Sequence, residues 1–387
     1  MRIFVLGTGA TGSLIARLLV RQGHQVTCGD RSPDRARRFL GKKSSIPIRQ
    51  VNARNLWSIV KAARGCHLIV NASTAVLNKI VLRAALRLRV HYLDTASHQT
   101  DDPFQAEQLR FAAQFLAKRR TAVINAGVAP GLTNLLVARS ADLLDGVETV
   151  HIRLYESTGS DEPVSQWSSD GAFDEAVSRP RVYRNGRFRF GKRFGEREVF
   201  RFPPPIGPAG VVLAAQDEVV TLPRVLGMRE MDVKIGGSDF ERLRRWYRQG
   251  KLRKSHGPGA NRFPQTPTPR QMAGLLARGA LYHARFAAAV VVQGHKGERR
   301  AVIRWDAVFP TLHQIRRREM YPSPVAWATA HLAALFVKHF PRGLPGVHPP
   351  EALPAKIRQA ILAGARTYGI RVTRRATLLK PLDADEG

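Results

Sequence analysis

MRIFVLGTGATGSLIARLLVRQGHQVTCGD, residues Met1–Asp30, holds the most informative pattern in the chain. Residues 3–6 form an apolar run typical of a buried strand, and the run ends at the glycine-rich turn Gly7–Gly12. Apolar residues then recur at helical spacing, and residues 25–28 resume as a strand that closes on Asp30. This order of strand, turn, helix and strand predicts a complete βαβ unit.

The turn has the glycine spacing of a dinucleotide-binding site. Gly7 permits a tight turn, Gly9 lets the backbone approach a pyrophosphate, and Gly12 allows the helix to pack closely on the strand. The N-terminus of that helix offers unpaired N–H groups to the phosphates. We expect the cofactor to be bound by Gly7, Thr8, Gly9, Ala10, Thr11, Gly12, Asp30 and Arg31. A doubly wound domain that kept the turn and lost the cofactor is the alternative.

The choice between NAD and NADP depends on the residues that follow the second strand. Asp30 would accept hydrogen bonds from a free ribose diol and repel a 2′-phosphate, which favours NAD. Arg31 and Arg35 lie next to it and could hold a phosphate. NAD is the preferred prediction and NADP the alternative.

Strands and helices alternate strictly from residue 1 to residue 125. Such alternation predicts an α/β fold of Rossmann type, in which a parallel, doubly wound sheet is covered by helices on both faces. Ligands of these sheets bind beyond the carboxyl ends of the strands. The residues that follow the later strand ends are therefore further site candidates. We expect the cofactor to be bound also by Asn71, Ala72, Ser73 and Gly127, and the candidates for catalysis or substrate binding are Asp94, Thr95, His98, Asn125, Thr133 and Asn134.

The stretch Asn125–Val137, NAGVAPGLTNLLV, is the second informative segment. Pro130 and Gly131 open a helix whose first turn exposes backbone donors, as an anion site requires. An ordinary Pro-Gly linker between two domains explains the same residues equally well.

The pattern changes to short strands and turns after Val147. The pair Asn185-Gly186 between two alternating runs predicts a β-hairpin. We therefore expect a second, α+β domain, followed by an apolar helix at residues 324–340 and another at residues 353–368. The segment Ser255–Pro269 is the most loop-like part of the chain.

The composition is that of a globular chain: 387 residues with 44% hydrophobic content can bury a sizeable core in two domains. The two cysteines, Cys28 and Cys66, have no spacing for a metal site or a disulfide framework, which favours a reducing cytoplasm. No run reaches the length of about 18 apolar residues that a membrane-spanning helix needs. We expect no metal site and no association with a membrane.

The charge is unusual, because 62 Lys and Arg residues face 30 Asp and Glu residues and leave a net charge of +32. Such an excess attracts anions, including nucleotides and nucleic acid. The basic residues are nevertheless dispersed along the whole chain, which is typical of solvated helix faces. We expect no specific binding of nucleic acid, and a polyanion-binding surface is the alternative.

Several of these motifs together resemble the saccharopine dehydrogenase and saccharopine reductase superfamily: the opening GTGATG with Asp30, the strand ends LIVNAS and HYLDTA, and above all NAGVAPGLTNLL. Later stretches resemble its smaller bacterial branch, which includes lysine 6-dehydrogenase and carboxynorspermidine dehydrogenase: FDEAVSRPRVYRNGRFRF, EVVTLPRVLGMREMDVKIGG and WATAHLAALFVKHFPRGLPGVHPPE.

The resemblance implies an arrangement in which the dinucleotide-binding domain is interrupted by a substrate domain. On that basis we expect the first domain at residues 1–130, an α+β substrate and dimerisation domain at 131–322, and C-terminal helices that return to the first domain at 323–387. The resemblance also implies oxidation of an amine carbon, or reduction of an imine, by a nicotinamide cofactor. Exposed sheet edges make a homodimer the expected assembly.

Oxidation of an amine carbon needs a base that removes the ammonium proton. Asp94 is the first candidate to pair with the ammonium of an amine or amino-acid substrate, and His98 is the second, as acid or base. A capping carboxylate and a surface histidine are their alternatives. The candidates for contact with the rest of the substrate are Thr95, Asn125, Thr133, Asn134 and Lys234, the last of which would reach from the second domain toward a carboxylate. A solvated strand position explains Lys234 equally well.

Overall fold

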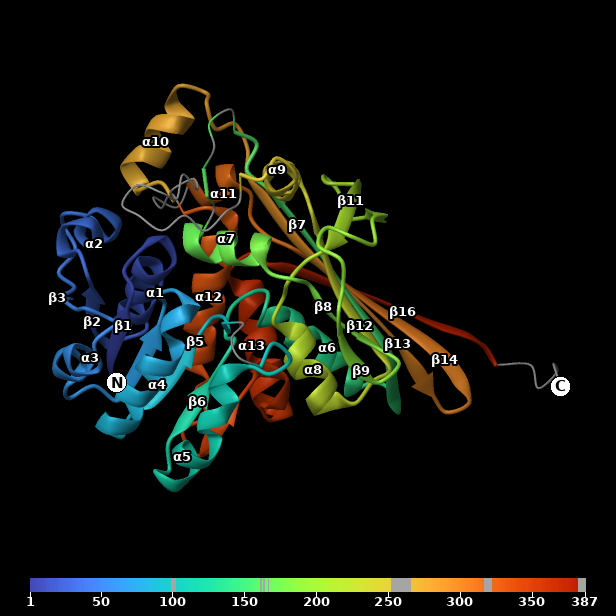
Figure 1. The fold of residues 1–387 in the computed structure, drawn as a ribbon, viewed down its shortest axis with the longest axis horizontal. Coiled ribbons are helices and arrows are strands. Elements are labelled where there is room, and N and C mark those ends of the chain that lie inside the picture. The colour runs from blue at the N-terminus through green and yellow to red at the C-terminus, as the bar shows by residue number, and fades with distance from the viewer. Residues whose placement is uncertain are drawn as a thin grey trace.

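The computed structural model describes residues 1–98, 102–160, 162, 164–165, 167–251, 266–316 and 322–381. Most of the loop expected at Ser255–Pro269 lies outside these ranges. Two sheets dominate the described part of the chain, and they lie side by side in Figure 1 with helices packed between them.

The first sheet has seven strands in the order β15-β6-β5-β4-β1-β2-β3, and every adjacent pair is parallel. Residues Ile3 to Leu6 of the central strand are almost fully buried, because helices cover both faces of the sheet. The predicted Rossmann-type fold is therefore confirmed. The strands are β1 (Arg2–Leu6), β2 (Gln25–Asp30), β3 (Ile48–Gln50), β4 (Leu68–Asn71), β5 (His91–Asp94), β6 (Thr121–Val123) and β15 (Gly346–His348).

The helices of this half follow the predicted alternation. Ser32 caps α2 by accepting a hydrogen bond from the Arg35 backbone N–H at 3.4 Å. Between β5 and β6 the helical segment is a 3₁₀ turn followed by a short α-helix. The elements are α1 (Ala10–Arg21), α2 (Pro33–Leu40), α3 (Leu56–Ala63), η1 (Ala75–Leu77), α4 (Asn78–Leu88), η2 (Glu107–Phe111) and α5 (Ala112–Ala117).

The second sheet is mixed and has the order β10-β11-β12-β7-β13-β14-β16, with β8 on β12 and β9 on β8. Only β7 and β12 pair in parallel among these described strands. The predicted second, mixed domain is thus present. Its strands are β7 (Gly146–Ser157), β8 (Arg181–Arg184), β9 (Arg187–Phe190), β10 (Glu198–Arg201), β11 (Pro208–Leu213), β12 (Glu230–Gly236), β13 (Arg285–Lys296), β14 (Arg299–Val308) and β16 (Arg371–Pro381).

Helices α6, α12 and α13 fill the space between the two sheets, and α7 lies above the junction (Figure 1). One continuous hydrophobic core therefore runs from β1 through α12 to β7 and β13. The helices are α6 (Leu132–Ala141), α7 (Ser169–Val177), α8 (Glu218–Leu226), α9 (Ser238–Arg248), α10 (Pro269–Ala277), α11 (Leu312–Arg316), α12 (Pro324–Lys338), η3 (Pro350–Ala352) and α13 (Ala355–Thr367).

The segment after residue 323 contributes to both halves of the molecule. Helix α12 packs against α1, and β15 extends the first sheet beside β6. Strand β16 instead forms the edge of the second sheet beside β14. The domain boundaries stay a prediction, and this strand shows that the C-terminal residues return to more than the first sheet.

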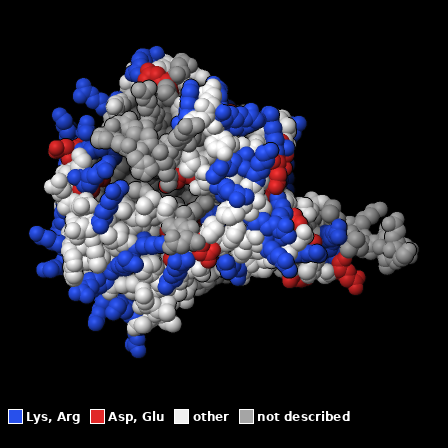
Figure 2. All heavy atoms as spheres, in the orientation of Figure 1, with Lys and Arg blue, Asp and Glu red and all other residues white. Residues whose placement is uncertain are grey.

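The surface is basic over both halves of the molecule, since Figure 2 shows Lys and Arg side chains dispersed across the face that it draws. None of the helices in the described ranges is long and apolar enough to cross a membrane. The strong positive charge is therefore a property of the general surface shown, and it does not mark one element of the fold.

Candidate active site

Two of the three glycines of the first turn, Gly7 and Gly12, are required by its geometry. A Cβ on Gly7, whose φ is +89°, would lie 2.7 Å from the Ser73 backbone, and one on Gly12 would lie 1.8 Å from the Gly7 carbonyl oxygen. A Cβ on Gly9 would meet no described atom within 4 Å. The space beside Gly9 and the start of α1, which no described side chain caps, fits a pyrophosphate group.

Asp30 lies at the carboxyl end of β2, where the backbone orients its carboxylate. One oxygen accepts a hydrogen bond from the Thr8 N–H at 2.8 Å, and the other from the Ser32 N–H at 3.0 Å. Each carboxylate oxygen can accept a further hydrogen bond, so the group is fixed and still able to bind a ribose diol. Arg31 is exposed next to it. These residues fit the adenosine end of a dinucleotide.

Asn71 shapes the loop that faces the glycine turn. Its side chain is buried, accepts a hydrogen bond from the Ser73 N–H at 3.2 Å, and donates to Asn78 at 2.9 Å. Ala72 and Ser73 consequently lie against the turn and on the wall of a cavity. Of this group, Asn71 supports the loop and its two neighbours face the cavity.

A cavity of about 310 Å³ lies between the carboxyl ends of the first sheet and the inner face of the second. The glycine turn contributes Thr11 to its wall, and the loop that contains Pro130 contributes another part. The loops after β4 and β5 contribute residues 72–75 and 95–98. The rest of the described lining comes from α12 and from the second domain, and includes Leu154, Glu156, Trp167, Asp174, Glu175, Asp217, Ile235, Phe286, Val325 and Thr329. The cavity therefore joins the dinucleotide-binding turn to the second domain.

The two predicted catalytic residues differ in position. Asp94 is 1% exposed, does not line the cavity, and accepts hydrogen bonds from Gln108 at 3.0 Å and from the Asn125 N–H at 2.8 Å. Burial raises the pKa of Asp94 to about 7, against the opposing effect of these hydrogen bonds. His98 lines the cavity, and its backbone N–H donates to Glu107 at 2.9 Å. The structure thus places His98 on the cavity wall, whereas the Asp94 side chain is buried inside the first domain.

Among the predicted substrate contacts in the first half, Thr95 lines the cavity. Asn125, Thr133 and Asn134 are fully buried and lie outside its lining. Thr133 donates to Glu218 at 2.8 Å and Asn134 to Glu351 at 3.0 Å, so both hold the start of α6 against α8 and η3.

Gly127 shapes the loop beneath this wall. A Cβ there would lie 3.0 Å from the Pro130 carbonyl oxygen and 3.1 Å from the Thr95 carbonyl oxygen. Gly127 itself does not line the cavity, whereas Val128, Ala129 and Pro130 do. The absence of a side chain at Gly127 lets the backbone at Thr95 and at Pro130 approach it closely.

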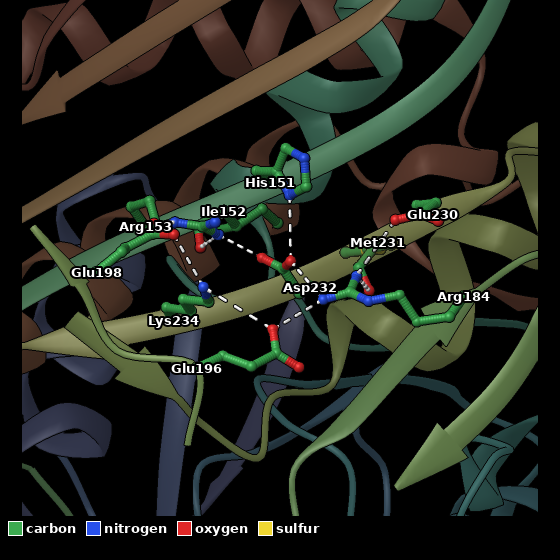
Figure 3. Close-up of polar contacts among 10 residues, drawn as sticks. All are labelled: His151, Ile152, Arg153, Arg184, Glu196, Glu198, Glu230, Met231, Asp232 and Lys234. Atoms are coloured by element: carbon green, nitrogen blue, oxygen red, sulfur yellow. Dashed lines mark hydrogen bonds and ion pairs between the residues drawn. The ribbon is translucent and has the colours of Figure 1, made fainter. Parts of the chain in front are cut away.

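Lys234 points away from the cavity, to the opposite face of the second sheet (Figure 3). Its ammonium group lies 2.8 Å from Glu198 and 3.9 Å from Glu196. Arg153, on the neighbouring strand, contacts Glu198 and Asp232 in the same cluster. The structure therefore places Lys234 in an ionic network, apart from the other predicted site residues.

Two carboxylates of the second domain that the sequence analysis missed do face the cavity. Glu156 lies two residues after Leu154 and therefore on the same, inward side of β7, and Glu175 lies on α7. Burial raises the pKa of Glu175 to about 8, opposed by the hydrogen bond from Gln216 and reinforced by the negative charge of Asp217. Burial also raises the pKa of Glu156, with further contributions from Asp239 and Glu175. The available sequence signal was an acid on the apolar face of an alternating strand.

Arg181, which the sequence analysis also missed, links the two domains near the cavity. It is 1% exposed and lies 3.0 Å from Asp217, which accepts a second hydrogen bond from the Ser97 N–H at 2.9 Å. Arg181 further donates to the Pro103 carbonyl oxygen at 3.1 Å. Because Ser97 and Pro103 belong to the first half and Arg181 to β8, the ion pair links the halves.

Residues 3–124 match the family described as the saccharopine dehydrogenase NADP binding domain. The first domain of this chain is thus a nucleotide-binding domain of the saccharopine dehydrogenase type. With this domain, the chain is an NAD(P)-dependent oxidoreductase that uses a nicotinamide dinucleotide. The recognition made from the sequence motifs is confirmed, whereas the bacterial branch stays a prediction.

The fold is shared with solved structures of the superfamily. Apo saccharopine dehydrogenase (L-Glu forming) from Saccharomyces cerevisiae matches with a TM-score of 0.71 at 12% identity, over 97% of this chain and 99% of the yeast chain. At this identity the match shows a common fold and does not transfer the yeast enzyme's substrate.

Two further structures are more distant. A mutant of meso-dapdh from Clostridium tetani E88 has a TM-score of 0.42 at 10% identity, over 92% of this chain and 95% of the other. A dehydrogenase from Chromobacterium violaceum has a TM-score of 0.40 at 11% identity, over 95% and 93%. Matches this distant bear on neither the substrate nor the site of this chain.

Proposed function

We propose that the chain transfers a hydride between the nicotinamide and the carbon of a C–N bond in a small amine or amino acid. The observation that carries this proposal is the composition of the cavity wall. The glycine turn contributes Thr11 on one side, and the second domain contributes Glu156 and Glu175 on the other. A carboxylate is the natural partner of an ammonium group.

The proposed reaction needs two transfers. The C–H bond of the amine carbon breaks and its electron pair leaves as hydride, while the nitrogen loses one proton as the C=N bond forms. The bound nicotinamide supplies the hydride acceptor. In the proposal His98, which borders the cavity, exchanges the proton, because an imidazole titrates near neutral pH.

The remaining residues bind and orient the substrate and the cofactor. In the proposal Glu156 or Glu175 holds the ammonium end of the substrate, and Leu154, Ile235 and Phe286 exclude water from the reacting carbon. Asp94 has a supporting role through its hydrogen bond to the Asn125 N–H. Asp30 would bind the adenosine ribose, for which reason we propose NAD as the preferred cofactor.

The first experiment tests the cofactor site and the reaction together. The purified full chain is titrated with NADH and NADPH, and turnover is followed at the absorbance band of the reduced nicotinamide with lysine, saccharopine and simple amines. We expect turnover of at least one amine, and weaker binding of both cofactors, by about tenfold or more, in Gly9→Val, because its side chain would fill the pyrophosphate space.

Gly343→Val is the matched control, since a Cβ there also meets no described atom within 4 Å and Gly343 is far from the turn in the sequence. Unchanged cofactor binding in Gly9→Val would contradict the proposed site. NADPH binding about tenfold tighter than NADH would contradict the NAD preference.

A noncatalytic dinucleotide- or polyanion-binding protein is the second candidate, favoured by the net charge of +32. That function predicts no turnover with any amine, together with nucleic-acid binding that weakens steeply as salt is raised. The same titrations, repeated with a DNA duplex at two salt concentrations, separate the two functions.

A further inference from the structure

The cavity wall is acidic in a protein that is otherwise strongly basic. Its described lining contains the carboxylates Glu156, Asp174, Glu175 and Asp217, and no Lys or Arg. Asp217 already has a cation partner, because Arg181 lies 3.0 Å from it. Glu156 and Glu175, the two glutamates of the wall, form no ion pair with a described residue.

The hydrogen-bond partners of these two glutamates are neutral. Glu175 accepts a hydrogen bond from the Gln216 amide, and Glu156 interacts with the indole of Trp167. Arg242 also acts on Glu156, but its guanidinium pairs with Asp239 at 2.7 Å and lines a second pocket instead of this cavity. Two carboxylates that share a low-dielectric site repel each other unless a proton or a cation lies between them.

The same wall is poorly suited to a carboxylate. Recognition of a carboxylate in a protein site ordinarily uses a guanidinium or an ammonium group. The nearest cations on β7 and β12, Arg153 and Lys234, point to the opposite face of the sheet and are paired there (Figure 3). An α-carboxylate in the cavity would face acidic groups with no described cation to bind it.

The apolar part of the wall completes the recognition surface. Leu154, Ile235 and Phe286 lie beside the two glutamates on the inner face of the second sheet. They suit a chain of methylene groups.

We propose that the substrate is a dication without a carboxylate, an aliphatic diamine or short polyamine whose distal ammonium binds between Glu156 and Glu175. The other amine lies toward the glycine turn, where its carbon loses a hydride to the nicotinamide and its nitrogen loses a proton. The distal ammonium keeps its proton and its bonds throughout. This inference rests on the proposed function and narrows it from amines and amino acids to diamines.

The test compares three compounds of equal chain length with the full chain and its oxidised cofactor. Cadaverine has two ammonium groups, pentylamine has one, and lysine adds a carboxylate to the diamine. We expect kcat/KM for cadaverine to exceed that for both others by about tenfold or more, the equivalent of one lost charged contact. A kcat/KM for lysine equal to or above that for cadaverine would overturn the proposal.

Glu175→Gln and Glu156→Gln show whether these residues cause the preference. Each variant should raise KM for cadaverine by about tenfold and lower kcat/KM for cadaverine more than kcat/KM for pentylamine, because the distal contact is lost. Glu162→Gln, whose side chain is exposed, is the matched control and should keep the wild-type preference. A preference for cadaverine that survives in both variants would also overturn the proposal.

Failure of the proposed function gives a different result. If no amine is turned over, calorimetric binding of the same three compounds to the NADH-loaded protein tests the substrate class directly. Cadaverine binding that is tighter than lysine binding and is lost in Glu175→Gln supports the diamine site even without turnover. Equal or absent binding of all three compounds refutes it, whether or not the cofactor binds.

Discussion

The two faces of the second sheet hold their acidic residues in different ways. On the outer face Asp232 lies 2.9 Å from Arg184 and 3.2 Å from His151, and Glu198 lies 2.8 Å from Lys234 (Figure 3). Burial would raise the pKa of Asp232, but the hydrogen bond from His151 and the charges of Arg153 and Arg184 hold it well below its usual range. On the inner face the pKa values of Glu156 and Glu175 are raised.

The difference cannot come from a shortage of cations, because the chain has 62 Lys and Arg residues. Acids on the outer face are balanced within the protein, and their network holds strands and loops together. Glu156 and Glu175 instead line a cavity, and their hydrogen-bond partners among the described residues are neutral. The comparison separates charge that stabilises the fold from charge that is available to a ligand.

The largest expected effect follows from removing the cation that pairs with Asp217 in the cavity wall. Arg181→Met removes the only described ion-pair partner of Asp217, so we expect the free energy of unfolding to fall by about 3–5 kcal/mol. Urea unfolding at neutral pH measures the loss. Arg278→Met is the control, since its pair with Glu162 is about half exposed and should be worth less than about 1 kcal/mol. Equal losses of unfolding free energy in the two variants would refute the stabilising role of the Arg181–Asp217 ion pair.

An intermediate effect is expected on the outer face. Lys234→Met leaves Glu198 with one cation, Arg153, and should lower the free energy of unfolding by about 1–3 kcal/mol. Because Lys234 points away from the cavity, kcat/KM for the best amine should not change. Parallel urea unfolding and steady-state kinetics check both. A large fall in kcat/KM with unchanged stability would restore Lys234 as the substrate residue that the sequence predicted.

The smallest effect concerns Glu218, a buried acid that lies outside the cavity lining. Burial raises the pKa of Glu218 to about 7, whereas an unfolded glutamate titrates near about 4.3. Between these values the folded state binds a proton that the unfolded state has released. Stability therefore falls as pH rises through this window and levels off above about 7.

Glu218→Gln cannot ionise and should remove up to about 1.4 kcal/mol per pH unit from that slope. Urea unfolding between pH 5 and pH 8 measures it, with the exposed Glu298→Gln as the control. An unchanged slope in Glu218→Gln would show that Glu218 stays ionised in the fold, as the outer-face acids do.

The first sheet could be predicted because local signals and burial agree there. Its central strands are apolar on both faces, and the βα turns carry the expected glycines and caps. The hairpin at Asn185-Gly186 is likewise confirmed, since both residues have the positive φ that a type I′ turn requires. In these segments the local sequence signals already favour the observed conformation.

Helix α8 was missed because tertiary packing overrides its local preference. EVVTLPRVL is rich in β-branched residues and contains Pro223, both unfavourable in a helix interior. Its apolar side nevertheless packs against α6 and β12, and the buried Glu218 bonds to Thr133. Such contacts join residues 85 positions apart and leave no local signal.

The substrate side of the site was harder to predict because a strand has two faces. Lys234 and Ile235 are adjacent in the sequence, yet only Ile235 lines the cavity. Successive side chains of a strand point in opposite directions, so an error of one residue exchanges the cavity for the outer face. Which face of β7 and β12 meets the first domain depends on a parallel pairing that no local pattern encodes.

The shared C-terminal segment also has a consequence for synthesis of the protein. Strand β15 borders β6 in the first sheet, and β16 borders β14 in the second. Although β1 to β6 are made first, their sheet stays open at β6 until residue 348 has left the ribosome. During that interval the unpaired edge of β6 is exposed to other chains. Chaperones that shield nascent strands would therefore affect the yield of folded protein more than they affect its final stability.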